Sequence, residues 1–96
     1  MAAQVVVYLT AYCPFCHSAE RLLEKKGVAF EAIRVEGRSD LRAWMGETSG
    51  QTTVPQIFIN GQSIGGFSDM DALDRASKLD ALLAAEPSGD EQSLPR

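Results

Sequence analysis

Apolar positions in the first quarter of the chain change from a continuous run to a helical spacing. Val5 to Leu9 is a short run of β-branched, aromatic and aliphatic residues, the composition of a strand that is buried on both faces. From Phe15 to Leu23, apolar residues recur at i, i+4, i+7 and i+8 and share one face of a helix. The pattern predicts a buried strand that an amphipathic helix follows closely.

The middle of the chain repeats the order of strand and helix. Residues 28–35 are mostly apolar and predict a second strand, and a helix between two strands favours a right-handed crossover with a parallel pair. Residues 41–45 have the i, i+3, i+4 apolar spacing of a short second helix, with Ser39 or Asp40 as its cap. Packing in the core explains this cluster. The polar residues 46–53 predict a loop.

A hairpin and a last helix follow. Residues 54–59 and 62–64 flank Asn60-Gly61, the strongest short-range signal for a hairpin of two antiparallel strands. Residues 68–71, Ser-Asp-Met-Asp, resemble a capping box and open a final helix with a break near Asp80. The expected order is therefore strand, helix, strand, helix, two strands and helix.

Composition and charge narrow the class of protein. A chain of 96 residues with 45% hydrophobic and 23% charged residues is expected to form one soluble globular domain. A net charge of -4 argues against a nucleic acid or a membrane surface as partner. We therefore expect neither partner, and we expect a monomer.

The two ends of the chain affect its organisation and its location. Residues 1–85 are expected to form the domain, and residues 86–96, rich in Pro, Ser, Gly and acidic residues, to form a disordered C-terminal tail. The first residues lack a charged region followed by a long apolar stretch, and no segment approaches the ~20 apolar residues of a membrane span. We expect a cytoplasmic protein.

The stretch Cys13-Pro14-Phe15-Cys16 contains both cysteines and stands where the strand pattern meets the helix pattern. Pro14 suits the first helical position, where its fixed φ and missing N–H do no harm. The N–H groups and the dipole at the helix start would favour the thiolate of Cys13. Cys16, one turn further in, would be more buried and could attack a mixed disulfide on Cys13. The spacing predicts a redox-active dithiol.

Three other interpretations of the cysteines compete with this one. A C-x-x-C pair can be half of a zinc site, but four ligands are needed and only His17 lies nearby in sequence. Cys13 to His17 also matches the C-x-x-C-H signature of haem attachment, which would call for an export signal and a second axial ligand. Two buried, inert cysteines are the third alternative, which a position at a helix start disfavours. We expect no metal site.

The expected order of elements, with C-x-x-C after the first strand, is similar to the α/β thioredoxin fold, a four-stranded mixed sheet flanked by three or more helices. Three motifs in that order resemble those of the glutaredoxins: Cys13-Pro14-Phe15-Cys16, Thr53-Val54-Pro55 and Gly65-Gly66-Phe67-Ser68-Asp69. The resemblance extends from about residue 5 to residue 83 and points especially to the small bacterial dithiol type, glutaredoxin 3.

This resemblance implies a glutathione site. In the family the proline of the Thr-Val-Pro motif is cis, which implies a cis Pro55, and the backbone of Val54 would pair with the cysteinyl part of glutathione. Ser68 and the helix N–H groups would take the γ-glutamyl carboxylate and Asp69 the ammonium group, with helix capping as the alternative role of both residues. The residues expected to contact glutathione are Phe15, Thr53, Val54, Pro55, Gly66, Phe67, Ser68 and Asp69.

Two positions depart from the family pattern. Glutaredoxins commonly carry a lysine where this chain has Thr10, so one cation near the thiolate and the glycine carboxylate of glutathione is missing. Phe15 replaces the usual tyrosine and keeps its apolar face.

Gln51 or Gln56 could hydrogen-bond the glycine carboxylate, or be merely solvated. For His17 we favour no catalytic role, since a thiolate stabilised by the helix dipole needs no base.

The resemblance implies an enzyme, a glutathione-dependent thiol–disulfide oxidoreductase with Cys13 and Cys16 as catalytic residues. Protein disulfides and glutathionylated proteins would be its substrates. Glutathione would be the reducing co-substrate, recycled by glutathione reductase with NADPH, and no tightly bound cofactor is expected.

One rival hypothesis is a redoxin recycled by thioredoxin reductase, against which the glutathione motif argues. The other is a carrier of a glutathione-ligated 2Fe–2S cluster, which Pro14 disfavours because cluster-binding relatives usually have a small residue there.

Overall fold

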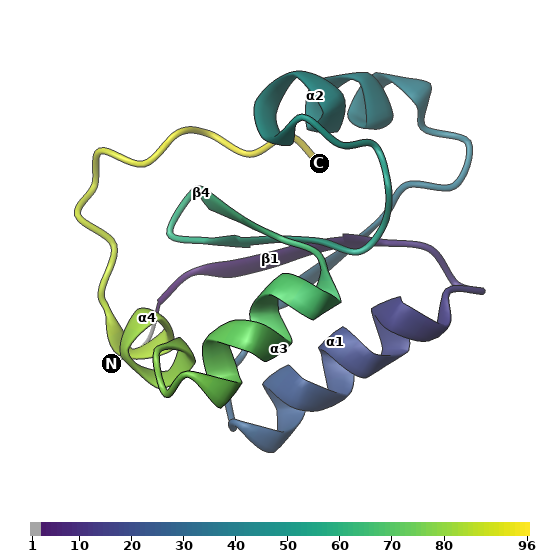
Figure 1. Cartoon of the computed structure of the whole chain (residues 1–96). Helices are drawn as coiled ribbons and strands as arrows, with labels where there is room; N and C mark the ends of the chain where they lie inside the picture. The colour runs from purple at the N-terminus through teal and green to yellow at the C-terminus, as the bar shows by residue number, and fades with distance from the viewer. Residues whose placement is uncertain (1–2) are drawn as a thin grey trace.

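A four-stranded mixed sheet with helices on both faces organises the chain (Figure 1). The structure, a computed structural model, describes residues 3–96. The elements in chain order are β1 (Val5–Leu9), α1 (Pro14–Lys25), β2 (Glu31–Arg34), α2 (Ser39–Ser49), β3 (Gln56–Ile59), β4 (Gln62–Gly65), α3 (Phe67–Arg75) and α4 (Leu79–Ala84). The strand order across the sheet is β2-β1-β3-β4, which places β1 and β3 in the centre.

The strand pairing confirms the predicted topology. β1 pairs in parallel with β2 and antiparallel with β3, and β4 returns antiparallel to β3. Asn60 and Gly61 have φ angles of 51° and 76°, which is the conformation that a two-residue Asn-Gly hairpin turn requires. This α/β architecture is the thioredoxin fold. Among residues 3–96, no helix has both the length and the apolar character that crossing a membrane takes.

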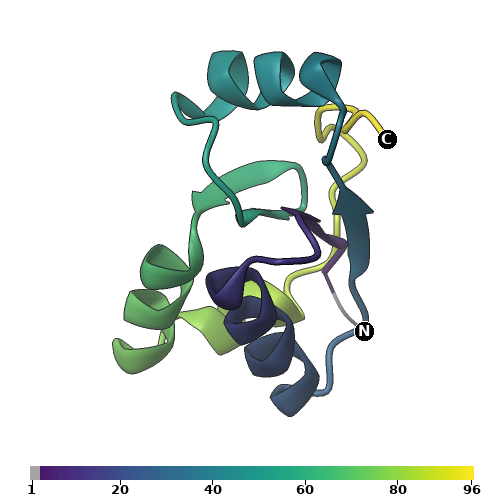
Figure 2. The same cartoon turned by 90° about the vertical axis from the view of Figure 1, so that its right-hand side faces the viewer.

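Each face of the sheet has its own core. Figure 2 shows α1, α3 and α4 on one face, while α2 lies on the other. β1 is buried along its whole length, and its side chains alternate between the two cores. Val5, Val7 and Leu9 face the α1 side, and Val6 and Tyr8 face α2. Burial on both faces explains why the sequence of β1 is a continuous apolar run.

An aromatic cluster fills the space between the sheet and α2. Tyr8, Trp44 and Phe58 pack with ring centroids 5.3, 5.4 and 5.6 Å apart. Leu41 and Met45 of the same helix are buried beside them. The apolar spacing of residues 41–45 is therefore core packing, as predicted.

Two predicted strands begin later in the structure. The predicted strand over residues 28–35 is shorter, because only Glu31–Arg34 form the strand that pairs with β1. The predicted strand over residues 54–59 begins at Gln56.

The predicted cap of α2 is also wrong. α2 begins at Ser39 with Arg38 as its N-cap residue, and no side chain caps this helix. Asp40 lies within the first turn of the helix, where its carboxylate binds the Arg38 guanidinium at 2.9 and 3.1 Å.

The predicted end of the second helix is wrong. α2 continues through residues 46–49, which the polar pattern predicts as a loop. The Ser49 hydroxyl donates to the Met45 carbonyl at 2.7 Å, and Gly50 then ends the helix with a left-handed φ of 80°. The predicted break near Asp80 is present, because α3 ends at Arg75 and α4 begins at Leu79.

Residues 86–96 form no helix or strand, and their disorder stays a prediction. In the structure this segment, yellow in Figures 1 and 2, runs back along the sheet toward α2. Its contacts with the sheet include a hydrogen bond from the Tyr8 hydroxyl to the Pro95 carbonyl (2.7 Å) and an ion pair between Arg96 and Glu31 (2.6 Å).

Deletion of residues 92–96 is expected to lower the free energy of unfolding by about 1–3 kcal/mol. Leu94 would lose its packing against the α2-side core, and the Tyr8 hydroxyl would lose its acceptor. Urea unfolding followed by the fluorescence of Trp44, the single tryptophan, measures the change. Arg96→Gln removes the exposed ion pair with Glu31 and the hydrogen bond to the Leu94 carbonyl but keeps Leu94 and Pro95, so it should change stability little. Equal stability of the deletion variant and the full chain would mean that the tail does not pack on the sheet.

Candidate active site

The two cysteines lie at the start of α1, in the turn that follows β1, as the sequence predicts. Cys13 is the N-cap residue, with extended backbone angles (φ -112°, ψ 111°), and Pro14 is the first helical residue. The missing N–H of Pro14 falls where a helix has no acceptor for it. Both cysteines are free thiols.

The Cys13 sulfur takes the place of the usual capping oxygen. It accepts the backbone N–H of Cys16 at 3.2 Å, and its thiol points toward the Val54 carbonyl at 3.8 Å. One contact ties the sulfur to the helix start, and the other ties it to the loop before β3. Cys13 is partly exposed, so its thiol is accessible to a substrate.

Cys16 lies in a different environment from Cys13. Its side chain is fully buried in the core between the sheet and α1. Burial, with a smaller effect of the neighbouring Cys13 thiol, raises the pKa of Cys16 to about 12. Cys16 is thus a neutral thiol at physiological pH, shielded from solvent and one helical turn from Cys13.

A groove of about 220 Å³ opens next to Cys13. Figure 1 shows the three segments that meet here: the start of α1, the loop before β3 and the start of α3. The Val54–Pro55 peptide bond in the loop is cis, as the resemblance implies. All eight residues predicted to contact glutathione line the groove together with Gln51; they are Phe15, Thr53, Val54, Pro55, Gly66, Phe67, Ser68 and Asp69.

The start of α3 differs from the predicted capping box. The N-cap residue is Gly66, and the Asp69 carboxylate accepts the Gly66 N–H at 2.9 Å. Ser68 therefore lies inside the helix, exposed at the groove, and is not its cap. Gly65 makes the earlier start possible, because it has a φ of 109° and a Cβ at this position would overlap the Asp69 carboxylate.

Gln56 has a structural position that the sequence does not reveal. It was expected either at the ligand or in solvent, but its side chain is fully buried on β3. Its Nε2 donates to the Thr53 carbonyl at 2.9 Å and so holds the loop that lines the groove. The available signal was a polar residue at the start of an otherwise apolar strand.

His17 and Tyr12 flank the cysteine turn. The His17 ring contacts the Ala11 carbonyl at 3.0 Å and Glu20 at 3.6 Å. Tyr12, which the sequence analysis did not single out, is 95% exposed directly before Cys13. Within residues 3–96, no three His, Cys, Asp or Glu side chains are grouped as a metal site would require.

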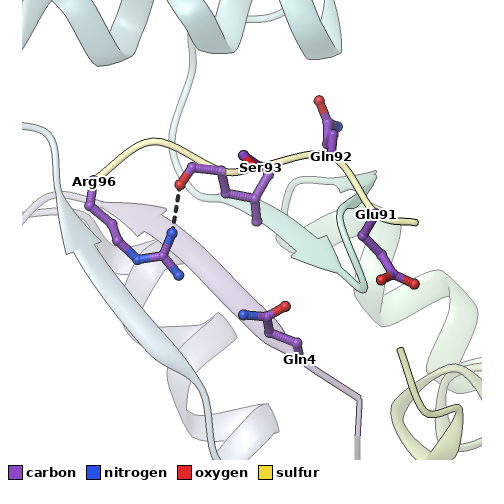
Figure 3. Close-up of a pocket in the computed structure, with 6 residues that line it drawn as sticks. Gln4, Glu91, Gln92, Ser93 and Arg96 are labelled. Carbon is purple, nitrogen blue, oxygen red and sulfur yellow. Dashed lines mark hydrogen bonds between the residues drawn. The ribbon is translucent and has the colours of Figure 1, made fainter. Parts of the chain in front are cut away.

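A larger cavity of about 460 Å³ lies between the tail and the start of β1 (Figure 3). Gln4 lies on one side, and residues 91–94 and 96 of the tail lie on the other. The Arg96 guanidinium is already bound to the Leu94 carbonyl and to Glu31. Neither cysteine lines this cavity or the groove, but Val54 of the groove has its carbonyl 3.8 Å from the Cys13 sulfur, so the groove is the candidate active site.

Comparison with known proteins agrees with this geometry. The family model for glutaredoxins matches residues 5–64. A glutaredoxin from Pseudomonas aeruginosa is 52% identical over 81 residues, which are 84% of this chain and 96% of the relative. Glutaredoxin 3 from Escherichia coli K12 is 48% identical over 81 residues, with 84% and 98% of the two chains covered.

Solved structures of glutaredoxins have the same fold. The complex of buckwheat glutaredoxin with glutathione matches with a TM-score of 0.79 at 31% identity and covers 84% of this chain and 76% of that one. The dithiolic glutaredoxin 2-C-Grx1 of Trypanosoma brucei brucei matches with a TM-score of 0.79 at 40% identity, with 85% and 88% covered. The chain therefore belongs to the glutaredoxin family and is a thiol–disulfide oxidoreductase.

Proposed function

We propose that this glutaredoxin uses glutathione as its reductant and acts on glutathionylated proteins and on protein disulfides. The observation that carries the proposal is the groove beside the Cys13 sulfur. Val54 connects the groove with the Cys13 sulfur, because its carbonyl oxygen lies 3.8 Å from that sulfur and its side chain or backbone lines the groove. A peptide in the groove would have its own sulfur within reach of Cys13.

The groove offers glutathione a contact for each part of the tripeptide. The backbone of Val54 can pair with the cysteinyl residue as an added strand does. The N–H groups at the start of α3 and the Ser68 hydroxyl can bind the γ-glutamyl carboxylate. The Asp69 carboxylate accepts one N–H of its own helix and is exposed, so it can also accept from the ammonium group. Phe15 and Phe67 provide apolar walls.

Of the parts of glutathione, the glycine carboxylate has the weakest binding partner in the groove. No lysine stands at Thr10, so Gln51 is the polar side chain of the groove that is available for this carboxylate. A neutral amide attracts a carboxylate less than a cation does. We infer that this protein binds glutathione more weakly than relatives that carry the lysine.

In the proposed reaction, the Cys13 thiolate attacks the glutathione sulfur of a protein–glutathione mixed disulfide. A bond forms between Cys13 and glutathione, the original S–S bond breaks, and its electron pair leaves on the protein sulfur, which takes a proton from solvent. A second glutathione thiolate then attacks the glutathione bound to Cys13. Oxidised glutathione leaves and the Cys13 thiolate is restored.

Reduction of a protein disulfide requires the second cysteine. Cys13 forms a mixed disulfide with one substrate sulfur, and the other leaves as a thiol. Cys16 loses its proton as it attacks the Cys13 sulfur, which forms the Cys13–Cys16 disulfide and releases the second substrate thiol. Glutathione then reduces this disulfide in two exchanges.

The wider setting of the reaction is also part of the proposal. Glutathione reductase with NADPH would return oxidised glutathione to the thiol. A cytoplasmic location fits this cycle, because the cytosol maintains a reduced glutathione pool. We propose that the protein acts there as a monomer and without a tightly bound cofactor.

Substitution of each cysteine by serine tests the two proposed roles. Turnover of a glutathionylated peptide, coupled to NADPH through glutathione reductase, should fall about a hundredfold or more in Cys13→Ser and stay within about threefold of wild type in Cys16→Ser. Reduction of a protein disulfide through the dithiol cycle should be lost in both variants. If the wild type instead turns over only with thioredoxin reductase, glutathione is not its reductant.

The raised pKa of Cys16 predicts a pH dependence of alkylation. A thiol with a pKa near 12 is protonated below that pH, so its reactive thiolate appears only as the pH rises toward 12. In Cys13→Ser, iodoacetamide should therefore leave Cys16 unmodified at pH 8, as measured by mass spectrometry. Cys16→Ser is the matched control, in which Cys13 should be alkylated at the same pH. Equal rates in the two variants would contradict the division of roles.

A further inference from the structure

Two large apolar side chains are strongly exposed among the described residues, and both lie next to the nucleophile. Tyr12 is 95% exposed and Phe15 is 62% exposed, one on each side of Cys13 in sequence. Exposed aromatic residues are informative because they are enriched at the centres of protein interfaces. Their place beside the reacting sulfur connects them with substrate binding.

The two rings belong to different surfaces. Phe15 lines the groove that we assign to glutathione, and Tyr12 does not line it. A glutathionylated protein presents two parts to the enzyme, the tripeptide and the polypeptide that carries the modified cysteine. When the tripeptide occupies the groove, the polypeptide must leave the site across another surface. Tyr12 provides an apolar contact outside the groove.

The backbone of Ala11, which precedes Tyr12, is held at both its N–H and its carbonyl. The Ala11 N–H donates to Glu36 at 2.7 Å, and the Ala11 carbonyl contacts the His17 ring at 3.0 Å. Glu36 is itself fixed by two hydrogen bonds from Arg34 at 2.9 and 3.1 Å. The turn between β1 and α1, which projects to the right in Figure 1, therefore presents Tyr12 to solvent on an anchored backbone.

We propose that Tyr12 is a docking residue for protein substrates, where it contacts an apolar side chain next to the reacting cysteine. This inference rests on the proposed function, because it assumes that glutathione occupies the groove. The distance fits: the Cα atoms of Tyr12 and Cys13 are about 3.8 Å apart, and in the exchange the leaving substrate sulfur lies in line with the attacked glutathione sulfur, only about two S–S bond lengths of roughly 2 Å from the Cys13 sulfur. A tyrosine ring therefore reaches substrate residues within about two positions of the reacting cysteine.

The charges around Tyr12 give this surface little selectivity among substrates. The Tyr12 ring is therefore the feature that can distinguish them. The charged groups near the turn include both signs: Arg34 is paired with Glu36, and the Glu20 carboxylate lies 3.6 Å from the His17 ring. Such pairs favour neither acidic nor basic substrates strongly. An aromatic ring prefers an aromatic or aliphatic partner, and a stacked pair stabilises a complex enough to change binding several-fold.

The experiment compares three substrates in the coupled assay with glutathione reductase. They are a glutathionylated hexapeptide with Phe beside the cysteine, the same peptide with Ser in its place, and the mixed disulfide of cysteine and glutathione. Tyr12→Ala should lower kcat/KM about three- to tenfold for the Phe peptide and leave the small mixed disulfide unchanged. Tyr12→Phe, which keeps the ring, should match wild type. Phe15→Ala should lower kcat/KM for all three substrates, because it changes the groove.

Two results would overturn the docking role. One is an equal loss on all three substrates in Tyr12→Ala, which would place the effect on Cys13 itself. The other is wild-type behaviour of Tyr12→Ala on the Phe peptide. If wild type turns over no glutathione mixed disulfide, the proposed function fails, and single-turnover reduction of disulfides of the same two peptides by the reduced enzyme then tests Tyr12 without glutathione. The Tyr12→Ala loss should again be confined to the Phe peptide.

Discussion

The contact between the Cys13 sulfur and the backbone N–H of Cys16 is the interaction on which the site depends. It places sulfur where a helix normally has a capping oxygen, so the positive end of the helix dipole lies at the reacting atom. The constraint originates in β1, whose burial on both faces fixes where the chain leaves the sheet. Val54 then meets the same sulfur from the loop before β3, which brings the groove to the nucleophile.

Burial divides the chemistry between two identical side chains. Cys13 is partly exposed at the helix start, whereas Cys16 lies in the core and its pKa is raised to about 12. A protonated, inaccessible thiol does not compete for substrate, but it stands one helical turn from any disulfide that forms on Cys13. The proposed roles of attack and resolution follow from position in the fold and need no further catalytic group.

Local sequence patterns predicted the parts of the fold that depend on neighbouring residues. The helix start at Pro14, the hairpin at Asn60-Gly61 and the continuous run of β1 each have a short-range cause, and all three are present. The residues that line the groove were predicted because three motifs resemble those of the glutaredoxins. No single motif contains all of these residues. The last turn of α2 was missed because its residues are polar and its end depends on a Ser49 side-chain contact and on Gly50.

Other features depend on contacts between distant parts of the chain, which periodicity cannot reveal. The tail meets the sheet through Pro95 and Tyr8, 87 positions apart. The Ala11 N–H, next to the exposed Tyr12, donates to Glu36, a residue 25 positions away. In both cases the sequence around the residue does not contain its partner. Gln56 differs, because composition assigns this polar side chain to the surface, yet it is fully buried on β3 and donates to the carbonyl of nearby Thr53.

The groove beside Cys13 is proposed to hold glutathione. Nuclear Overhauser spectroscopy tests this on the mixed disulfide between glutathione and Cys13, prepared in the Cys16→Ser variant so that the adduct is stable. The geometry predicts nuclear Overhauser contacts from the cysteinyl part to Val54 and from the γ-glutamyl part to Ser68 and Phe67. A tripeptide that makes none of these contacts, and lies instead against Tyr12 or free in solvent, would contradict the assignment of the groove.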